Sequence, residues 1–293
     1  NHRVLWDLVL IGLFGGFYIV PLYAVIQTRS DPSHRSRIIA GNNILNALFM
    51  VVSAIVAVLL LQAGLSIPEL LLTVALMNAA VAIFIYSLLP EYLMRFLVWM
   101  LIGLLYRIRS RGLDRIPDTG AAIVAPNHVS FVDALILGGT VRRPIRFVMY
   151  HKIFRIPVLN FIFRTARAIP IAPAKEDPAL LEKAYAQIDQ ALRNGELIGL
   201  FPEGGLTPDG EIQTFRPGIE KILASNPVPV VPVALCGLWE SMWSRRDSRM
   251  GRSRLPRRMR ARIEIVAGAP LDGATLEAAE LEDRVRELRG DAA

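Results

Sequence analysis

Three long apolar stretches without a charged side chain occupy the first 90 residues and constrain the fold more than any other feature. They are residues 8–27, the core of 38–68, and 70–90. Because a helix needs about 20 mostly apolar residues to cross the hydrocarbon of a bilayer, each stretch is long enough to span it. We therefore expect three transmembrane helices. Since the chain begins at Asn1 on the edge of an apolar span, we also expect it to be part of a longer protein.

Arginines follow the first and third stretches and predict their orientation. They are Arg29, Arg35 and Arg37 in the first loop, and Arg95, Arg107, Arg109 and Arg111 after residue 90. By the positive-inside rule both groups are cytoplasmic, and the link around residues 64–67 lies on the opposite side. This predicts a multi-pass protein of a cell inner membrane, with the rest of the chain on the cytoplasmic side.

A fourth apolar stretch, residues 96–106, has only eleven uncharged residues between Arg95 and Arg107. It is too short to span a bilayer, and we interpret it as an interfacial helix. We assign residues 1–90 to the membrane helices and 91–111 to this helix and a linker. Residues 112–293 form a separate domain.

Short apolar runs alternate with amphipathic stretches after residue 112. The runs are 121–125, 146–150, 168–171, 197–201, 228–235 and 262–266. Their lengths are typical of strands, whereas residues 178–194 place apolar side chains at helical spacing after a capping Asp177. Together with the first 90 residues, this predicts transmembrane helices followed by an α/β layered domain with a mostly parallel or mixed central sheet.

The first candidate for chemistry is the segment NHVSFVD, which follows the predicted strand 121–125. With His128 in the turn and Asp133 at the start of a helix, the carboxylate holds one ring nitrogen and leaves the other free to take a proton. The same segment fits a simpler role, because Ser130 and Asp133 also form an S-x-x-D capping box. The segment alone leaves both interpretations open.

A second candidate is FPEGG at residues 201–205, where a predicted strand ends. Ligands of open α/β sheets bind at the carboxyl ends of strands, so we expect Glu203 to lie near His128. Gly204 and Gly205 would let backbone amides approach a polar head group, while Glu203 hydrogen-bonds its hydroxyls. The simpler alternative is a strand followed by a turn.

The two segments resemble the first and third motifs, NHxxxxD and FPEG, of the phospholipid and glycerol acyltransferase family. RAIPI at 167–171, FRPGI at 215–219 and VPVVPVAL at 228–235 extend the resemblance to roughly residues 92–270. It implies that His128, oriented by Asp133, is catalytic and deprotonates a lysolipid hydroxyl, which attacks an acyl thioester directly. The substrate-binding residues it implies are Asn127, Ser130, Arg167, Phe201, Pro202, Glu203, Gly204, Gly205 and Arg216.

The resemblance implies neither a metal nor a redox cofactor, and acyl-ACP or acyl-CoA is the co-substrate. The expected partners are membrane lipids, a lysophospholipid acceptor and acyl carrier protein. The formal charge of +7 also suits nucleic acid, but the neighbouring apolar spans favour an anionic membrane surface. We therefore expect no nucleic-acid partner.

Two departures from the family pattern bear on the acceptor. Members that use lysophosphatidic acid commonly end the second motif in Arg, where this chain has Pro173, and follow FPEG with Thr-Arg, where it has Gly205-Leu206. Since Arg suits bidentate phosphate recognition, this favours a zwitterionic lysophospholipid. An enzyme that acylates 1-acylglycerol-3-phosphate is the alternative. Arginines that would compensate are Arg164, Arg167 and Arg216.

Residues 15–27 and 35–51 carry a second resemblance, to the last helices of the bacterial lysophospholipid transporters of the major facilitator superfamily. Some of these transporters are fused to such an acyltransferase, which implies coupled lysophospholipid import. Two further alternatives stay open. One is a transport protein with a regulatory soluble domain, and the other is a thioesterase in which His128 activates water.

One more segment is strongly basic, with nine arginines and a single acid, Asp247, between residues 245 and 262. A solvated loop, a contact with anionic lipid and a docking site for an acidic carrier protein all fit this charge run. The arginines are Arg245, Arg246, Arg249, Arg252, Arg254, Arg257, Arg258, Arg260 and Arg262.

Overall fold

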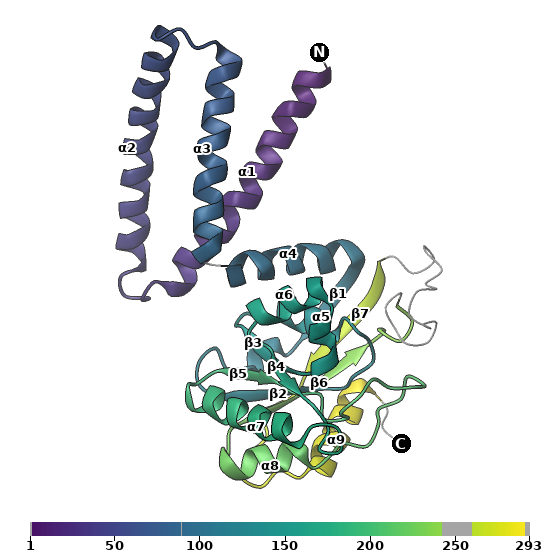
Figure 1. Cartoon of the computed structure of the whole chain (residues 1–293). Helices are drawn as coiled ribbons and strands as arrows, with labels where there is room; N and C mark the ends of the chain where they lie inside the picture. Colours follow the sequence, from purple (N-terminus) through teal and green to yellow (C-terminus); the bar gives the residue numbers. More distant parts are fainter. Residues whose placement is uncertain (1, 89, 242–259, 291–293) are drawn as a thin grey trace. The chain divides into compact units, whose positions relative to one another are not determined.

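A computed structural model describes residues 2–88, 90–241 and 260–290 (Figure 1). The chain divides into two compact units, Asn1–Leu93 and Met94–Ala293. Of the basic segment, Arg260 and Arg262 are described; Arg245, Arg246, Arg249, Arg252, Arg254, Arg257 and Arg258 lie outside the described residues.

The first unit contains three helices, α1 (His2–Arg29), α2 (Arg35–Gln62) and α3 (Ile67–Leu88). By length and composition all three are able to cross a membrane. Most of their large apolar side chains are exposed, and a bond from the Tyr86 hydroxyl to the Tyr18 carbonyl, 3.0 Å long, joins α3 to α1. The three predicted apolar helices are confirmed.

The second unit begins within α4 (Pro90–Leu105), which covers the predicted interfacial stretch. Ile102 of α4 is buried, and a Cβ added at Gly139 would lie 2.6 Å from it. The linker assignment of residues 106–111 is corrected by the structure, because they form strand β1 (Tyr106–Arg111). Tyr106 is buried whereas Arg107 and Arg109 are exposed. This alternation is typical of a sheet edge.

A seven-stranded sheet in the order β1-β7-β6-β2-β5-β3-β4 forms the centre of the second unit. Its other strands are β2 (Ala122–Pro126), β3 (Ile145–Tyr150), β4 (Ile169–Ile171), β5 (Leu197–Gly199), β6 (Val230–Cys236) and β7 (Ala261–Ala267). Adjacent strands run parallel, except that β6 and β7 are antiparallel. The predicted mostly parallel or mixed sheet is confirmed.

Helices cover both faces of the sheet, as Figure 1 shows. They are α5 (Asp133–Thr140), α6 (Pro157–Thr165), α7 (Pro178–Arg193), α8 (Gly218–Ser225) and α9 (Ala278–Arg289), with short 3-10 turns η1 (Leu113–Arg115) and η2 (His151–Arg155). Successive strand residues point to opposite faces, so Val124 of β2 packs in the core with α5, and Ile123 packs in the core with α7, α8 and α9. The predicted cap of α7 is confirmed, since the Asp177 carboxylate accepts from the Leu180 amide at 2.9 Å.

Candidate active site

His128 and Asp133 meet in the turn between β2 and α5. The Nδ1 atom of His128 lies 2.9 Å from Oδ2 of Asp133. The same oxygen accepts the amides of Val129 at 2.7 Å and Ser130 at 2.9 Å. One carboxylate oxygen therefore holds both the imidazole and the turn that leads into α5, whereas Val132, the N-cap residue of α5, has no side-chain cap bond.

The carboxylate is completely buried, whereas the His128 side chain is 22% exposed. Oδ1 of Asp133 is buried and has no hydrogen-bond partner in the described part of the chain. Burial raises the pKa of Tyr106 to about 12; a hydrogen bond with the Ser241 side chain opposes this rise, and the charge of Asp133 adds a smaller part of it. Tyr106 thus keeps its proton at neutral pH.

Glu203 fixes the backbone of the same turn from a distant loop. Its Oε1 accepts the His128 amide at 2.6 Å and its Oε2 accepts the Gln213 amide at 3.1 Å. Burial raises the pKa of the Glu203 carboxyl, and these two bonds partly oppose the rise. The side chain is 2% exposed and both oxygens accept backbone amides, so the contacts described here favour a structural role for Glu203, and its predicted role as a ligand of substrate hydroxyls stays a prediction.

A stack of rings supports the imidazole. The His128 ring lies 4.0 Å from the Phe201 ring, centroid to centroid, with 25° between their planes. Phe147 stacks on Phe201 in turn at 6.0 Å. A Cβ at Gly199 would come within 2.4 Å of the Phe147 ring, so β5 needs glycine there to admit the stack. With Asp133 on one edge and Phe201 on its face, the imidazole has one orientation.

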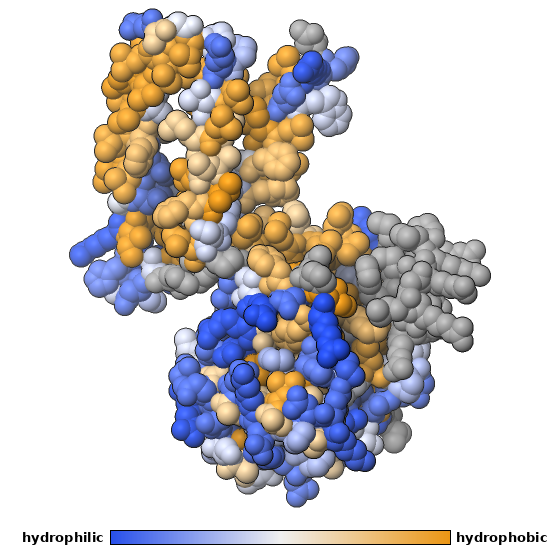
Figure 2. Space-filling model, viewed as in Figure 1, coloured by the Kyte–Doolittle hydropathy of each residue, from blue (hydrophilic) through white to orange (hydrophobic). Residues whose placement is uncertain are grey.

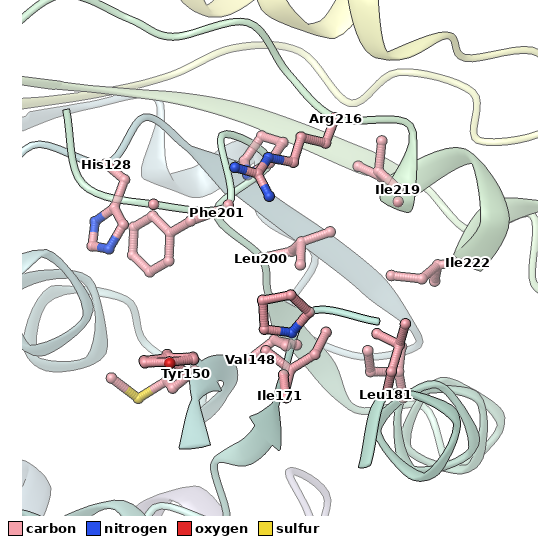
Figure 3. Close-up of a pocket in the computed structure, with 18 of the residues that line it drawn as sticks. His128, Val148, Tyr150, Ile171, Leu181, Leu200, Phe201, Arg216, Ile219 and Ile222 are labelled. Atoms are coloured by element: carbon pink, nitrogen blue, oxygen red, sulfur yellow. The ribbon is translucent and has the colours of Figure 1, made fainter. Parts of the chain in front are cut away.

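His128 opens onto a cavity of about 740 Å³ (Figure 3). Such a volume falls within the usual range of small-molecule sites. Val148, Ile171 and Leu200 line it from the sheet, and Leu181 and Ile222 line it from α7 and α8. Only four of its lining side chains, all among the described residues, carry nitrogen or oxygen: His128, Tyr150, Tyr185 and Arg216. The cavity is therefore an apolar chamber with a histidine in its lining.

Five of the predicted substrate-binding residues line this cavity: Phe201, Pro202, Gly204, Gly205 and Arg216. Gly204 has φ of 70°, and a Cβ there would lie 2.9 Å from the Arg216 guanidinium. The glycine is thus required by its left-handed backbone and by the close approach of Arg216. Its amide bonds to the Phe201 carbonyl at 3.1 Å, so it closes the turn instead of facing a ligand.

Three predicted substrate-binding residues do not reach the cavity. Asn127 is buried and joins β2 to β6, donating to the Leu235 carbonyl at 3.2 Å and accepting its amide at 2.7 Å. Ser130 is also completely buried. Arg167 precedes β4, so it lies at the amino end of a parallel strand and pairs with Glu196 at 3.0 Å. Their roles as substrate ligands stay predictions, and the contacts seen here hold the backbone or pair with Glu196.

Sequence reasoning missed the lining that comes from α7 and α8. Leu181 and Ile188 of α7 recur at helical spacing, and this pattern predicts ordinary core packing. They line the cavity together with Tyr185 and Ile219. No local signal separates a helix face that packs against a sheet from one that faces a chamber.

Residues 107–236 match the family model described as Acyltransferase. The chain contains an acyltransferase domain. It is 28% identical over 138 residues to a chloroplastic 1-acyl-sn-glycerol-3-phosphate acyltransferase of Arabidopsis thaliana, covering 47% of this chain and 38% of that protein. It is 30% identical over 131 residues to the 1-acyl-sn-glycerol-3-phosphate acyltransferase of Borreliella burgdorferi, and this match covers 42% of this chain and 49% of that protein. The match thus spans less than half of either relative.

The acyltransferase domain also shares its fold with a solved structure. The crystal structure of the 1-acyl-sn-glycerophosphate (LPA) acyltransferase PlsC from Thermotoga maritima aligns with a TM-score of 0.54 at 20% sequence identity. The alignment covers 69% of this chain and 80% of that one. The likeness supports the α/β architecture described above.

Glu203→Gln should remove a pH dependence of stability. Burial raises the pKa of this carboxyl above its ordinary value of 4.5, so the native protein binds the proton more tightly than the unfolded chain. The stabilising contribution is fully present below the unfolded pKa and is lost as the pH rises through the native pKa. In Tm measurements from about pH 4 upward, the parent protein should lose more stability than the variant across this window. Parallel profiles would contradict this account of Glu203.

Proposed function

We propose that this domain transfers a fatty acyl group from an acyl thioester to the free hydroxyl of a lysophospholipid. One observation carries the proposal. His128, held 2.9 Å from Asp133, lines an apolar cavity of about 740 Å³. A base for a hydroxyl and a chamber for an alkyl chain thus occur at one place.

The His128–Asp133 pair assigns the proton steps. An Nδ1–H donated to Asp133 leaves Nε2 unprotonated, and Nε2 takes the proton of the lysolipid hydroxyl. The oxygen then bonds to the thioester carbonyl carbon, the carbon–sulfur bond breaks, and the leaving thiolate recovers the proton from His128. Asp133 stabilises the imidazolium between these steps, a role typical of a buried carboxylate partner.

The cavity accounts for recognition of the acyl chain. Each methylene that moves from water into an apolar site contributes about 0.8 kcal/mol. Leu181, Ile219 and Ile222 line the chamber from α7 and α8, while Phe201 lines it beside His128. A thioester carbonyl next to His128 therefore allows its alkyl chain to extend between the sheet and these helices.

Arg216 is the residue we assign to the acceptor phosphate. It is the one guanidinium among the described residues that line the cavity, where Pro173, Gly205 and Leu206 also contribute. A single exposed cation suits the single negative charge of a phosphodiester better than a dianionic phosphomonoester. We therefore favour a zwitterionic lysophospholipid. The second candidate is 1-acylglycerol-3-phosphate, which the names of the relatives favour.

Arg216→Gln should raise the KM for the lysophospholipid about tenfold and change kcat little, because a hydrogen bond to a charged group is worth about 1.5–3 kcal/mol. Arg193→Gln is a matched control, since Arg193 ends α7 and pairs with Asp189 at 3.1 Å. Steady-state kinetics with varied acceptor give both constants. An unchanged KM in Arg216→Gln would remove Arg216 from the acceptor site.

The proposal is tested by acylation assays of the full chain with a panel of acceptors. Labelled acyl-ACP and acyl-CoA are each offered with zwitterionic lysophospholipids and with 1-acylglycerol-3-phosphate. We expect a diacyl product from a zwitterionic acceptor with at least one donor. Product from 1-acylglycerol-3-phosphate alone would support the second candidate, and no product with any pair would contradict the proposal.

The cellular setting forms part of the proposal. Three helices able to cross a membrane support a location at a bilayer, and the flanking arginines favour an inner membrane with the domain on the cytoplasmic side. Coupled import of the lysophospholipid rests on the resemblance of residues 15–27 and 35–51 to transporter helices. Uptake of labelled lysolipid by cells with and without the full-length protein tests the coupling.

A further inference from the structure

A second pocket shares Arg216 with the apolar cavity but differs from it in chemistry. Its volume is about 440 Å³, and it is formed by the loop between β5 and α8. Polar surface alone marks no site, since Figure 2 shows hydrophilic residues over much of one face of the domain. A hollow that shares a guanidinium with the cavity of His128 is a more specific feature. We call it the polar pocket. It is lined by Glu203, Asp209, Glu211, Ile212, Gln213, Thr214 and Arg216.

The loop that forms the polar pocket is fastened to the turn that carries His128. The Thr207 amide donates to the His128 carbonyl at 3.0 Å, and the His128 amide donates to Glu203 at 2.6 Å. The second oxygen of Glu203 accepts the Gln213 amide at 3.1 Å. Bonds from both halves of the loop therefore hold the polar pocket at a fixed position relative to the imidazole. A pocket ordered in advance loses less conformational entropy when a ligand binds.

Asp209 lies at the tip of this loop with one oxygen unused. Its Oδ1 accepts the Thr207 hydroxyl at 2.9 Å and the Glu211 amide at 3.0 Å. Oδ2 has no hydrogen bond to any residue that the structure describes. The amide bond from Glu211, followed by the bond from Thr207, lowers the pKa of the Asp209 carboxyl, so it is charged at neutral pH. Arg289 of α9 supports the tip by donating to the Gly210 carbonyl at 2.9 Å.

Two opposite charges of the polar pocket have no partner. Both oxygens of Glu203 accept backbone amides, and Glu211 pairs with Arg289. Asp209 and Arg216 are exposed, and neither forms an ion pair within the described part of the chain. One carboxylate and one guanidinium thus line the same pocket without pairing with each other, so both are available to a ligand that carries both charges.

We infer that the polar pocket binds the head group of the acceptor, with its phosphodiester on Arg216 and an ammonium group on Asp209. This inference rests on the proposed function, from which it takes the lysophospholipid acceptor. A zwitterionic head group presents these two charges in sequence after the glycerol. An ammonium group has three N–H donors, and the Gln213 and Thr214 side chains, which also line the pocket, offer oxygens beside the carboxylate.

Asp209 would also discriminate between acceptors. A specific site distinguishes two ligands by the difference between their affinities. A lysophospholipid without an ammonium group leaves the Asp209 charge unpaired, and a dianionic phosphomonoester near it is repelled. Because Asp209 is exposed, the ion pair should be worth roughly a three- to fivefold difference in affinity, the range of exposed pairs.

Binding of the isolated head group is measured without any reaction. Glycerophosphoethanolamine and glycerophosphoglycerol are both soluble in water and carry the same phosphodiester, but only the first has an ammonium group. In saturation-transfer NMR with the full chain in detergent micelles, the parent protein should bind the first roughly three- to fivefold more tightly. Asp209→Asn should bind both equally. Equal affinities in the parent protein, or binding of neither compound, would overturn the inference.

Asp272→Asn is the matched control for this measurement. Asp272 is exposed, and its Oδ1 accepts the Ala274 amide at 3.0 Å, as that of Asp209 accepts the Glu211 amide. It does not line the polar pocket, so this variant should keep the preference of the parent protein. Loss of the preference in both variants would contradict a specific role of Asp209.

Steady-state kinetics with two acceptors separate this inference from the proposed function. In Asp209→Asn, the KM for 1-acylglycerophosphoethanolamine divided by the KM for 1-acylglycerophosphoglycerol should rise roughly three- to fivefold. An unchanged ratio with both constants raised would indicate a packing defect and contradict the inference. If the parent protein acylates neither acceptor, the proposed function fails, while the NMR preference still decides whether the polar pocket binds an ammonium group.

Discussion

His128→Ala should lower kcat/KM for acyl transfer by about a thousandfold, because it removes the group that takes and returns the proton. The histidine side chain is 22% exposed and its partner Asp133 is fully buried, so truncation opens no cavity inside the core. Rates with saturating thioester and lysophospholipid give the loss. Far-ultraviolet circular dichroism and the Tm verify that the variant is folded.

His34→Ala is the matched control for this variant, since His34 lies in the exposed turn before α2 and contacts Ser33 at 2.8 Å. Its rate should equal that of the parent protein. Retention of more than about a tenth of the parent rate in His128→Ala would be incompatible with general-base catalysis by this residue.

Asp133→Asn should give the second-largest loss, about a hundredfold or more in kcat with little change in KM. A neutral amide retains one acceptor oxygen for His128, Val129 and Ser130, but it does not stabilise the imidazolium as a carboxylate does. Hydrogen bonds to a neutral acceptor are also weaker than those to a charged one, by about 1 kcal/mol each. Both kcat and Tm should therefore fall.

The control for this variant is Asp114→Asn, in the exposed turn η1, which should change neither quantity. A fall in Tm with an unchanged kcat would show that Asp133 serves only the start of α5. That result would return the segment to its capping-box interpretation.

Local patterns were sufficient to predict most of the fold. The apolar run at 121–125 predicted a strand, which is β2 (Ala122–Pro126). The helical spacing at 178–194 predicted a helix, which is α7 (Pro178–Arg193). The lengths of α2 and α3 follow from stretches of apolar residues alone. Strand β1 was missed because its pairing partner β7 lies about 150 positions later, with Tyr106 opposite Ala261. Without knowledge of β7, the arginines of β1 look like the basic residues that commonly follow a membrane helix.

The proximity of His128 and Asp133 was predicted from the sequence, whereas the long-range contacts of the motif residues were not. His128 and Asp133 are five positions apart, and the turn geometry that joins them is readable from their spacing. Glu203 accepts a hydrogen bond from the His128 amide, which lies 75 positions earlier in the chain. Asn127 accepts one from the Leu235 amide, which lies 108 positions later. Neither partner is visible in the sequence, so motif residues that hold the loops look the same as those that touch a substrate.

The central claim is that the acyl group passes directly to a lysophospholipid hydroxyl at His128, and a product balance in the reconstituted full chain tests it most directly. Free thiol, diacyl phospholipid and free fatty acid are measured from one labelled thioester, with and without lysophospholipid. We predict one diacyl lipid for each thiol released, and thiol release that depends on both the acceptor and His128. Fatty acid released at the same rate without any acceptor would identify a thioesterase and contradict the account.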